Sequence, residues 1–180
     1  MGDEYTYTRV AIIGKPDVDL RKEEFSDITF GDYIQNHKEL PPASGVFCIK
    51  LREGVAANGI VDVYYGNKAM QVKISCPEKE IVYVGKSSNI FNRVNRMFSS
   101  YKGANMVARK LNRIIPARDD KDIDADMLIP MPNITADQAK NLLEKVEFAY
   151  FIEENMVKRD FKKVRAVNEY MPCLNIGFEH

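Results

Sequence analysis

The residues best suited to chemistry are a tyrosine, a lysine and an arginine that follow one another closely. Tyr83 lies in a strand-like apolar run, Lys86 comes directly after Gly85, and Arg93 falls on the first turns of a predicted helix. Lysine supplies a point charge, arginine supplies fork-shaped donors, and the phenol supplies a directed hydroxyl. Together these groups suit a phosphate, so the sequence predicts a phosphate site where a strand meets a helix.

The charge of the chain is unevenly distributed, although its formal net charge is zero. Residues 83–118 contain no Asp or Glu, and the segment 119–126 that follows is strongly acidic. A basic block of this kind is typical of a surface that binds a polyanion, and a solvated helical face is the alternative. The residues expected to contact the polyanion are Arg96, Lys102, Arg109, Lys110 and Arg113.

Hydrophobic periodicity predicts mostly strands early in the chain and mostly helices later. The expected strands are 5–13, 46–51, 60–65, 70–74, 80–84 and 127–131. The expected helices are 30–37, 89–99, 105–115, 135–143 and 146–167, with Thr135 as an N-cap. This order of elements indicates an α+β fold. A Pro- and Gly-containing break at 41–45 predicts an N-terminal extension, 1–41, followed by a main domain, 42–180.

Glu153 is the expected acidic member of the site. On the predicted helix 146–167 it shares a stripe with apolar residues one turn away on either side. A carboxylate on a core-facing stripe is costly unless it is paired or binds a metal. An ion pair with Arg93 or Lys86, a stripe edge that reaches solvent, and a metal site are therefore the alternatives.

Five short elements of the sequence follow one another in a recognisable order. They are Gly45-Val46-Phe47, Tyr83-Val84-Gly85, Arg93 ten residues after Tyr83, Glu153-Glu154-Asn155-Met156-Val157-Lys158, and Pro172-Cys173-Leu174-Asn175. Together they resemble the GIY-YIG nuclease family over residues 42–177, and Lys86 is similar to a lysine of its excision-repair members. The resemblance implies a small antiparallel sheet, flanked by helices, with the two triplets on neighbouring strands. The inserted segment 52–79, which contains a predicted hairpin, is more similar to the restriction members.

The resemblance also implies an activity, which is metal-dependent hydrolysis of DNA phosphodiester bonds. Glu153 would hold Mg²⁺ or Mn²⁺, Arg93 would bind the scissile phosphate, and Lys86 and Tyr83 would position or deprotonate water. DNA would then be the polyanion that the basic block binds. The residues expected to have structural roles are Gly45, Phe47, Gly85 and Asn175.

One departure from the family pattern concerns catalysis, because Phe47 stands where the family has its first tyrosine. A phenyl ring cannot accept a proton, and losing a general base typically costs ~10²–10⁴-fold in rate. The candidate replacements for this missing tyrosine are Tyr83, Lys86, His37, and Tyr64 or Tyr65 of the insertion. The alternative is a catalytically inactive module that binds nucleic acid.

The remaining composition suggests a cytoplasmic protein with reduced cysteines at 48, 76 and 173. No apolar run approaches the roughly 20 residues that span a bilayer, and no secretory leader is visible, so no membrane partner is expected. Cutting both DNA strands usually needs two active sites, so a homodimer and a monomer are both open.

Overall fold

The protein is described by a computed structural model that covers residues 28–65, 67–115 and 132–175. Its centre is a three-stranded antiparallel sheet in the order β4-β1-β5, formed by β1 (Gly45–Leu51), β4 (Ile81–Ser87) and β5 (Val146–Ile152). β1 is the middle strand, and every residue on it except Lys50 is buried. The expected strands 46–51 and 80–84 are confirmed, although β4 continues through Lys86 to Ser87.

A separate hairpin lies between β1 and β4 in the sequence. It consists of β2 (Ala57–Tyr65) and β3 (Lys68–Cys76), which form a two-stranded antiparallel sheet of their own. The predicted hairpin is thus confirmed, and both strands are longer than expected. α3 (Met106–Ile114) packs against β2, and Gly59 lies against the backbone and side chain of Ile114.

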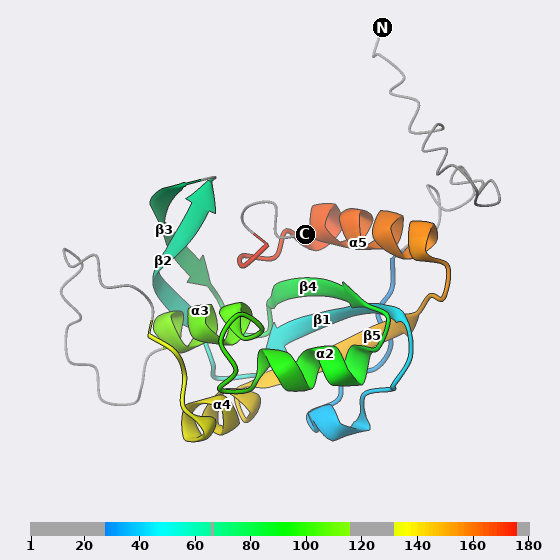
Figure 1. Ribbon diagram of the computed structural model, residues 1–180, viewed down its shortest axis with the longest axis horizontal. Helices are drawn as coiled ribbons and strands as arrows, with labels where there is room; N and C mark the ends of the chain where they lie inside the picture. Colours follow the sequence, from blue (N-terminus) through cyan, green and yellow to red (C-terminus); the bar gives the residue numbers. More distant parts are fainter. Residues whose placement is uncertain (1–27, 66, 116–131, 176–180) are drawn as a thin grey trace, which may run out of the picture.

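Helices cover both faces of the main sheet (Figure 1). α2 (Ile90–Met97), α3 and α4 (Ala136–Leu143) lie on one side, and α5 (Met156–Tyr170) lies on the other. Because side chains alternate along a strand, Phe47 and Ile49 join the apolar cluster of α2, whereas Val46 and Cys48 join a second cluster with Ala166 of α5. The molecule is therefore α+β, with the sheet between two apolar layers.

Polar side chains begin three of the helices. Asn89 accepts a hydrogen bond from the backbone N–H of Asn92, and Asn155 accepts one from Lys158. Thr135 and Gln138 form a reciprocal capping box at the start of α4, which confirms the predicted cap. The expected helices 89–99, 105–115 and 135–143 are confirmed as α2, α3 and α4, with slightly shorter bounds.

Of the two remaining expected helices, 146–167 is helical only from Met156 onward, as α5, and 30–37 is not helical over most of its length. The segment 146–152 is a strand, β5, because its aromatic and β-branched residues pair along the whole of β1. The segment 30–37 is extended, and Ile34 forms a bridge with Phe148; only His37–Glu39 makes a short 3₁₀ turn, η1. The strands expected at 5–13 and 127–131 lie outside the described residues.

The described part of the expected N-terminal extension packs along the free edge of β5. Ile28, Phe30 and Leu40 are buried, and the ring of Phe30 contacts Phe151. Tyr170 of α5 donates a hydrogen bond from its hydroxyl to the carbonyl of Ile28 at 2.8 Å. Within the described ranges, no helix has the length and apolar character needed to cross a bilayer.

Candidate active site

The two glycine-containing triplets lie side by side on β1 and β4. Phe47 is opposite Gly85, and Ile49 is opposite Tyr83, so Phe47 and Tyr83 share the face that α2 covers. Their ring centroids are 6.2 Å apart. A Cβ atom on Gly85 would lie 2.5 Å from Cζ of Phe47 and 2.8 Å from Cε1 of Tyr83. Glycine is therefore required at position 85 by the two rings that pack over it.

Both rings are core residues. Phe47 is fully buried and Tyr83 is only 5 % exposed. Phe47 therefore fills the layer between the sheet and α2 as an apolar side chain. Because so little of Tyr83 is exposed to solvent, it could position or deprotonate only a water molecule held close to the ring.

Lys86 lies on the opposite face of the sheet from Tyr83, because it is three residues further along the same strand. Its Nζ atom is 2.5 Å from Oδ1 of Asp160 on α5, and the two side chains are 35 % and 48 % exposed. The expected convergence of Lys86 with Tyr83 is wrong, since the two side chains lie on opposite faces of β4, although Lys86 is near the end of the strand. The junction itself is a turn in which Ser87 and Asn89 hydrogen-bond to each other before α2 begins.

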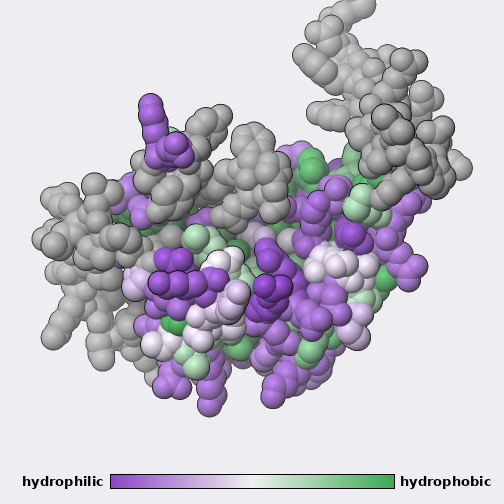
Figure 2. Space-filling model, in the orientation of Figure 1, coloured by the Kyte–Doolittle hydropathy of each residue, from purple (hydrophilic) through white to green (hydrophobic). Residues whose placement is uncertain are grey.

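Arg93 lies on the first turn of α2 and is exposed. In the part of the chain that the structure describes, it has no acidic partner. Arg96 and Lys102 are also exposed, and Arg109 and Arg113 are partly exposed. The face of the molecule that carries α2 is mostly hydrophilic, with small scattered apolar areas (Figure 2). Arg93 is thus accessible to an anion from solvent.

Lys110 does not fit its expected role in contacting a polyanion, because it is only 4 % exposed. It lies on the same helical stripe as the buried residues Val107 and Ile114. This spacing of three and four residues is visible in the sequence and indicates burial. The accessible basic surface therefore consists of residues on α2, the following loop and the outer side of α3.

Glu153 follows β5 and precedes α5, so the expected position on a helical stripe is wrong. Its Oε1 atom accepts a hydrogen bond from the N–H of Asn155 at 3.1 Å, and its Oε2 atom is 2.6 Å from Nζ of Lys162. The side chains of Glu153 and Lys162 are only 14 % and 20 % exposed. The carboxylate is indeed ion-paired, but with Lys162 rather than with Arg93 or Lys86.

Ser44 connects the two sides of the site. Its carbonyl accepts a hydrogen bond from the N–H of Glu153 at 3.0 Å, and its hydroxyl donates to the carbonyl of Ser88 at 3.0 Å. The neighbouring Gly45 pairs with Ser87 on one side and with Ile152 on the other. A Cβ atom on Gly45 would overlap the carbonyl oxygen of Phe151, so this close approach requires glycine.

The four expected catalytic residues are therefore divided between the two faces of the sheet. Tyr83 and Arg93 lie on the α2 side, and Lys86 and Glu153 lie on the α5 side. Because neighbouring strands are about 4.8 Å apart, β4 and β5 are separated by about 10 Å across β1. Lys86 and Glu153 both lie at the end of the sheet where β1 begins, and α2 starts at the same end, since Ile90 N–H bonds the carbonyl of Ala43.

Glu153 is the expected metal ligand, and a cation held by this one carboxylate and several waters would have to displace the Lys162 ammonium, which lies 2.6 Å from Oε2. An ionised carboxylate offers about four lone-pair positions, and Glu153 uses two of them. Mg²⁺ commonly binds through one or two carboxylates and keeps the rest of its shell as water. A cage built only from protein ligands does not fit, because the described residues contain no group of three or more His, Cys, Asp or Glu side chains placed to share an ion.

His37 lies in η1, which packs against α2. Burial, and secondarily the charge of Lys38, lower the pKa of His37 from its usual value. The imidazole is thus neutral near pH 7 and able to accept a proton. Tyr64 and Tyr65 are the other candidate replacements for the missing phenol. Their side chains are not among those that the structure describes.

Asn175 makes a paired contact with the strand that carries Tyr83. Its side-chain oxygen accepts from the N–H of Val84 at 2.8 Å, and its side-chain nitrogen donates to the carbonyl of Val84 at 2.9 Å. Leu174 adds a bond from its N–H to the carbonyl of Val82. The C-terminal segment thus satisfies the outer edge of β4.

Sequence reasoning missed the two α5 residues that contact the expected site, Asp160 and Lys162. The predicted continuous helix 146–167 does not indicate that either side chain points toward β4 or Glu153. The signal that could have located them is Asn155, whose side chain caps a helix that begins at Met156.

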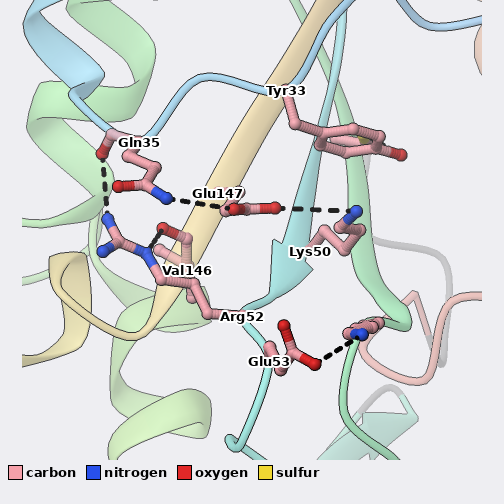
Figure 3. Close-up of polar contacts among 9 residues, drawn as sticks. Tyr33, Gln35, Lys50, Arg52, Glu53, Val146 and Glu147 are labelled. Carbon is pink, nitrogen blue, oxygen red and sulfur yellow. Dashed lines mark hydrogen bonds and ion pairs between the residues drawn. The ribbon is translucent and has the colours of Figure 1, made fainter.

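A second polar cluster at the opposite end of the sheet is structural (Figure 3). Lys50 pairs with Glu147 at 3.5 Å and lies 3.7 Å from the ring centroid of Tyr33. Arg52 donates to the carbonyl of Val146 at 2.9 Å and also to the carbonyl of Gln35. Burial raises the pKa of Tyr33 above its usual value, and burial likewise raises that of the neighbouring Cys48 thiol to about 12. These groups hold the N-terminal segment onto β1 and β5.

Comparison of this chain with protein-family models, with curated proteins and with solved structures gives no match.

Proposed function

We propose that this protein is a metal-dependent DNA endonuclease with a GIY-YIG-like fold. The observation that carries the proposal is the end of the sheet at Ser44 and Gly45. There the start of α2, which bears Arg93, and the Glu153 carboxylate approach β1 from opposite sides. The antiparallel pairing of the two triplets and the requirement for glycine at positions 45 and 85 support the same fold.

Each side chain has a role that follows from its environment. Arg93 is exposed and binds the scissile phosphate through two parallel donors. Glu153 holds Mg²⁺ or Mn²⁺, which when bound polarises the phosphate and stabilises the leaving oxygen. Lys86 exchanges Asp160 for a phosphate oxygen, because both partners are anionic and the pair is partly solvent-exposed. Tyr83 or His37 orients the attacking water.

A DNA-binding module without catalysis is the second candidate. Phe47 favours it, because this buried ring has no group that could handle a proton. The pair of Glu153 with Lys162 favours it as well, since a cation must compete with an ammonium only 2.6 Å away.

For the endonuclease, the inserted hairpin is consistent with a restriction-like member, and a homodimer would supply two sites for cutting both strands.

A plasmid digest with and without Mg²⁺ or Mn²⁺ tests the proposal. We expect the wild-type chain to nick or linearise duplex DNA only with metal, and Glu153→Gln and Arg93→Ala each to abolish cleavage. Glu154→Gln is the matched control, because Glu154 is the exposed neighbour of Glu153, and it should cut like wild type. Thermal melts of all three variants show whether a loss of cleavage reflects unfolding.

Two outcomes separate the candidate functions. DNA retention on a filter without any cleavage, over many sequences and with either metal, would leave only the binding module. In that case Phe47→Tyr is informative, because restored cleavage would show that the missing phenol was the defect. Absence of both cleavage and retention would exclude both candidates.

A further inference from the structure

Tyr101 is an exposed aromatic residue on the loop that joins α2 to α3. Its exposure of 65 % is exceeded only by Met171 among the large hydrophobic side chains of the described residues. Burial of an aromatic ring stabilises the folded state, and this loop leaves the ring of Tyr101 in solvent instead. A role at the surface would account for the exposed ring.

Hydrogen bonds within the loop and to Asn133, which precedes α4, brace the loop. Asn105, which is fully buried, donates from its side-chain nitrogen to the carbonyl of Ser99 and to Asn133, both at 2.8 Å. Asn133 in turn donates to the carbonyl of Ser100 at 2.8 Å. The N–H of Tyr101 bonds the hydroxyl of Ser99 at 3.3 Å. The ring is thus presented on a braced turn.

Positive charge surrounds the ring. The guanidinium of Arg96 is 5.9 Å from the ring centroid, and Lys102 beside it is exposed. The segment 83–118 contains no Asp or Glu that could neutralise these groups locally. An exposed aromatic face flanked by cations is the usual platform for single-stranded nucleic acid, since bases stack on the ring and the cations hold the backbone.

We propose that Tyr101 stacks on an unpaired nucleobase, with Arg96 and Lys102 holding the adjacent phosphates. This inference rests on the proposed nucleic-acid function and adds a preference for unpaired bases. In a closed duplex the faces of the bases are covered by their neighbours, so the ring can stack only where a strand is single or locally opened.

The test compares a single-stranded oligonucleotide of about 12 nucleotides with a duplex of the same sequence. Tyr101→Ala should bind the single strand about fivefold to hundredfold more weakly than wild type. It should bind the duplex within about twofold of wild type, because the phosphate contacts remain. Tyr101→Phe, which keeps the ring, should match wild type on both probes. Equal single-strand affinity for Tyr101→Ala and wild type would overturn the proposal.

Fluorescence gives a second readout, because the chain contains no tryptophan. In Tyr101→Trp the indole should be quenched on binding the single strand, as stacking on a base requires. Val164→Trp is the control reporter, since Val164 is 58 % exposed on α5, across the sheet; its emission should change little. A complex that forms without quenching in Tyr101→Trp contradicts stacking while leaving DNA binding intact. Failure of wild type to bind either probe would instead overturn this inference and the proposed DNA function together.

Discussion

Asn175 binds both backbone polar groups of Val84, since its one side-chain amide accepts from the N–H and donates to the carbonyl. Val84 is fully buried, so both backbone groups depend on this amide for satisfaction. The contact ties the last described residue of the chain to the strand that carries Tyr83, Gly85 and Lys86.

Replacing Asn175 by Ala should lower the free energy of unfolding by about 2–4 kcal/mol, because two buried backbone groups lose their partner. Asn175→Asp should also destabilise the protein, because one carboxylate oxygen would face the carbonyl oxygen of Val84 where the amide now donates. Urea denaturation measures both changes, and Asn168→Ala is the matched control at an exposed asparagine. A variant Asn175→Ala as stable as Asn168→Ala would show that these two hydrogen bonds contribute nothing.

Gly85→Ala should destabilise the protein by about 1–3 kcal/mol, since its methyl group would press into the rings of Phe47 and Tyr83. Shortening the opposing side chain should relieve the overlap, so the double variant Gly85→Ala with Phe47→Leu should show favourable coupling. A double-mutant cycle from denaturation curves measures that term. Strict additivity of the two single effects would mean that the ring does not limit position 85.

The strands of the triplets and the cap at Thr135 could be predicted because their signals are local. A short apolar run next to glycine and a threonine three residues before Gln138 need no tertiary information. β5 could not be predicted in this way. Val146, Ala149 and Tyr150 suit a helical stripe as well as a strand, and only pairing with β1 decides between them.

The error in β5 carried over to Glu153. On a continuous helix this residue would face the core, and Arg93 or Lys86 would be its natural partners. With a strand ending at Ile152 and a helix starting at Met156, the carboxylate instead contacts Lys162. The start of α5 at Met156 thus explains why the expected metal ligand pairs with Lys162.

Removal of the Glu153 carboxylate should affect stability as well as activity. Glu153→Ala deletes the acceptor for Asn155 N–H and the partner of Lys162, which should cost about 1–3 kcal/mol. Glu153→Gln retains an acceptor and should cost less. Thermal denaturation compares both with Glu154→Ala, which is expected to stay within about 0.5 kcal/mol of wild type. If Glu153→Ala were as stable as the control, the pair with Lys162 would be energetically silent.

Cys48 should make stability fall at alkaline pH. Its folded-state pKa is raised from 9.0 to about 12 by burial, so between these values the unfolded chain loses a proton that the folded protein keeps. The stability is therefore complete below pH 9 and decreases as pH rises, by up to about 1.4 kcal/mol per unit. Cys48→Ala should show a shallower decrease in urea denaturation across this range. Parallel pH profiles for the two proteins would contradict the assignment.

DNA binding should depend on salt through the accessible basic residues of α2 and α3. Each phosphate contact contributes about 0.9 to the slope of log affinity against log salt. Arg93→Ala combined with Arg96→Ala should therefore reduce the slope by about 2, as measured by fluorescence anisotropy at several salt concentrations. Lys79→Ala is the control, because Lys79 is an exposed lysine already paired with Glu53. An unchanged slope in the double variant would place the DNA elsewhere on the protein.

The bonds of Ser44 have a mechanical consequence. The backbone carbonyl of Ser44 accepts from the N–H of Glu153, where the segment between β5 and α5 begins. The hydroxyl of Ser44 donates to the carbonyl of Ser88 in the turn that leads into α2. Ser44 thus links the backbone at Glu153 to the turn that precedes α2, and the carbonyls of Ala43 and Pro41 accept hydrogen bonds from the first N–H groups of that helix. Inserting or deleting one residue between Pro41 and Ser44 would therefore shift the start of α2 relative to the Glu153 backbone while leaving the sequence of both elements unchanged.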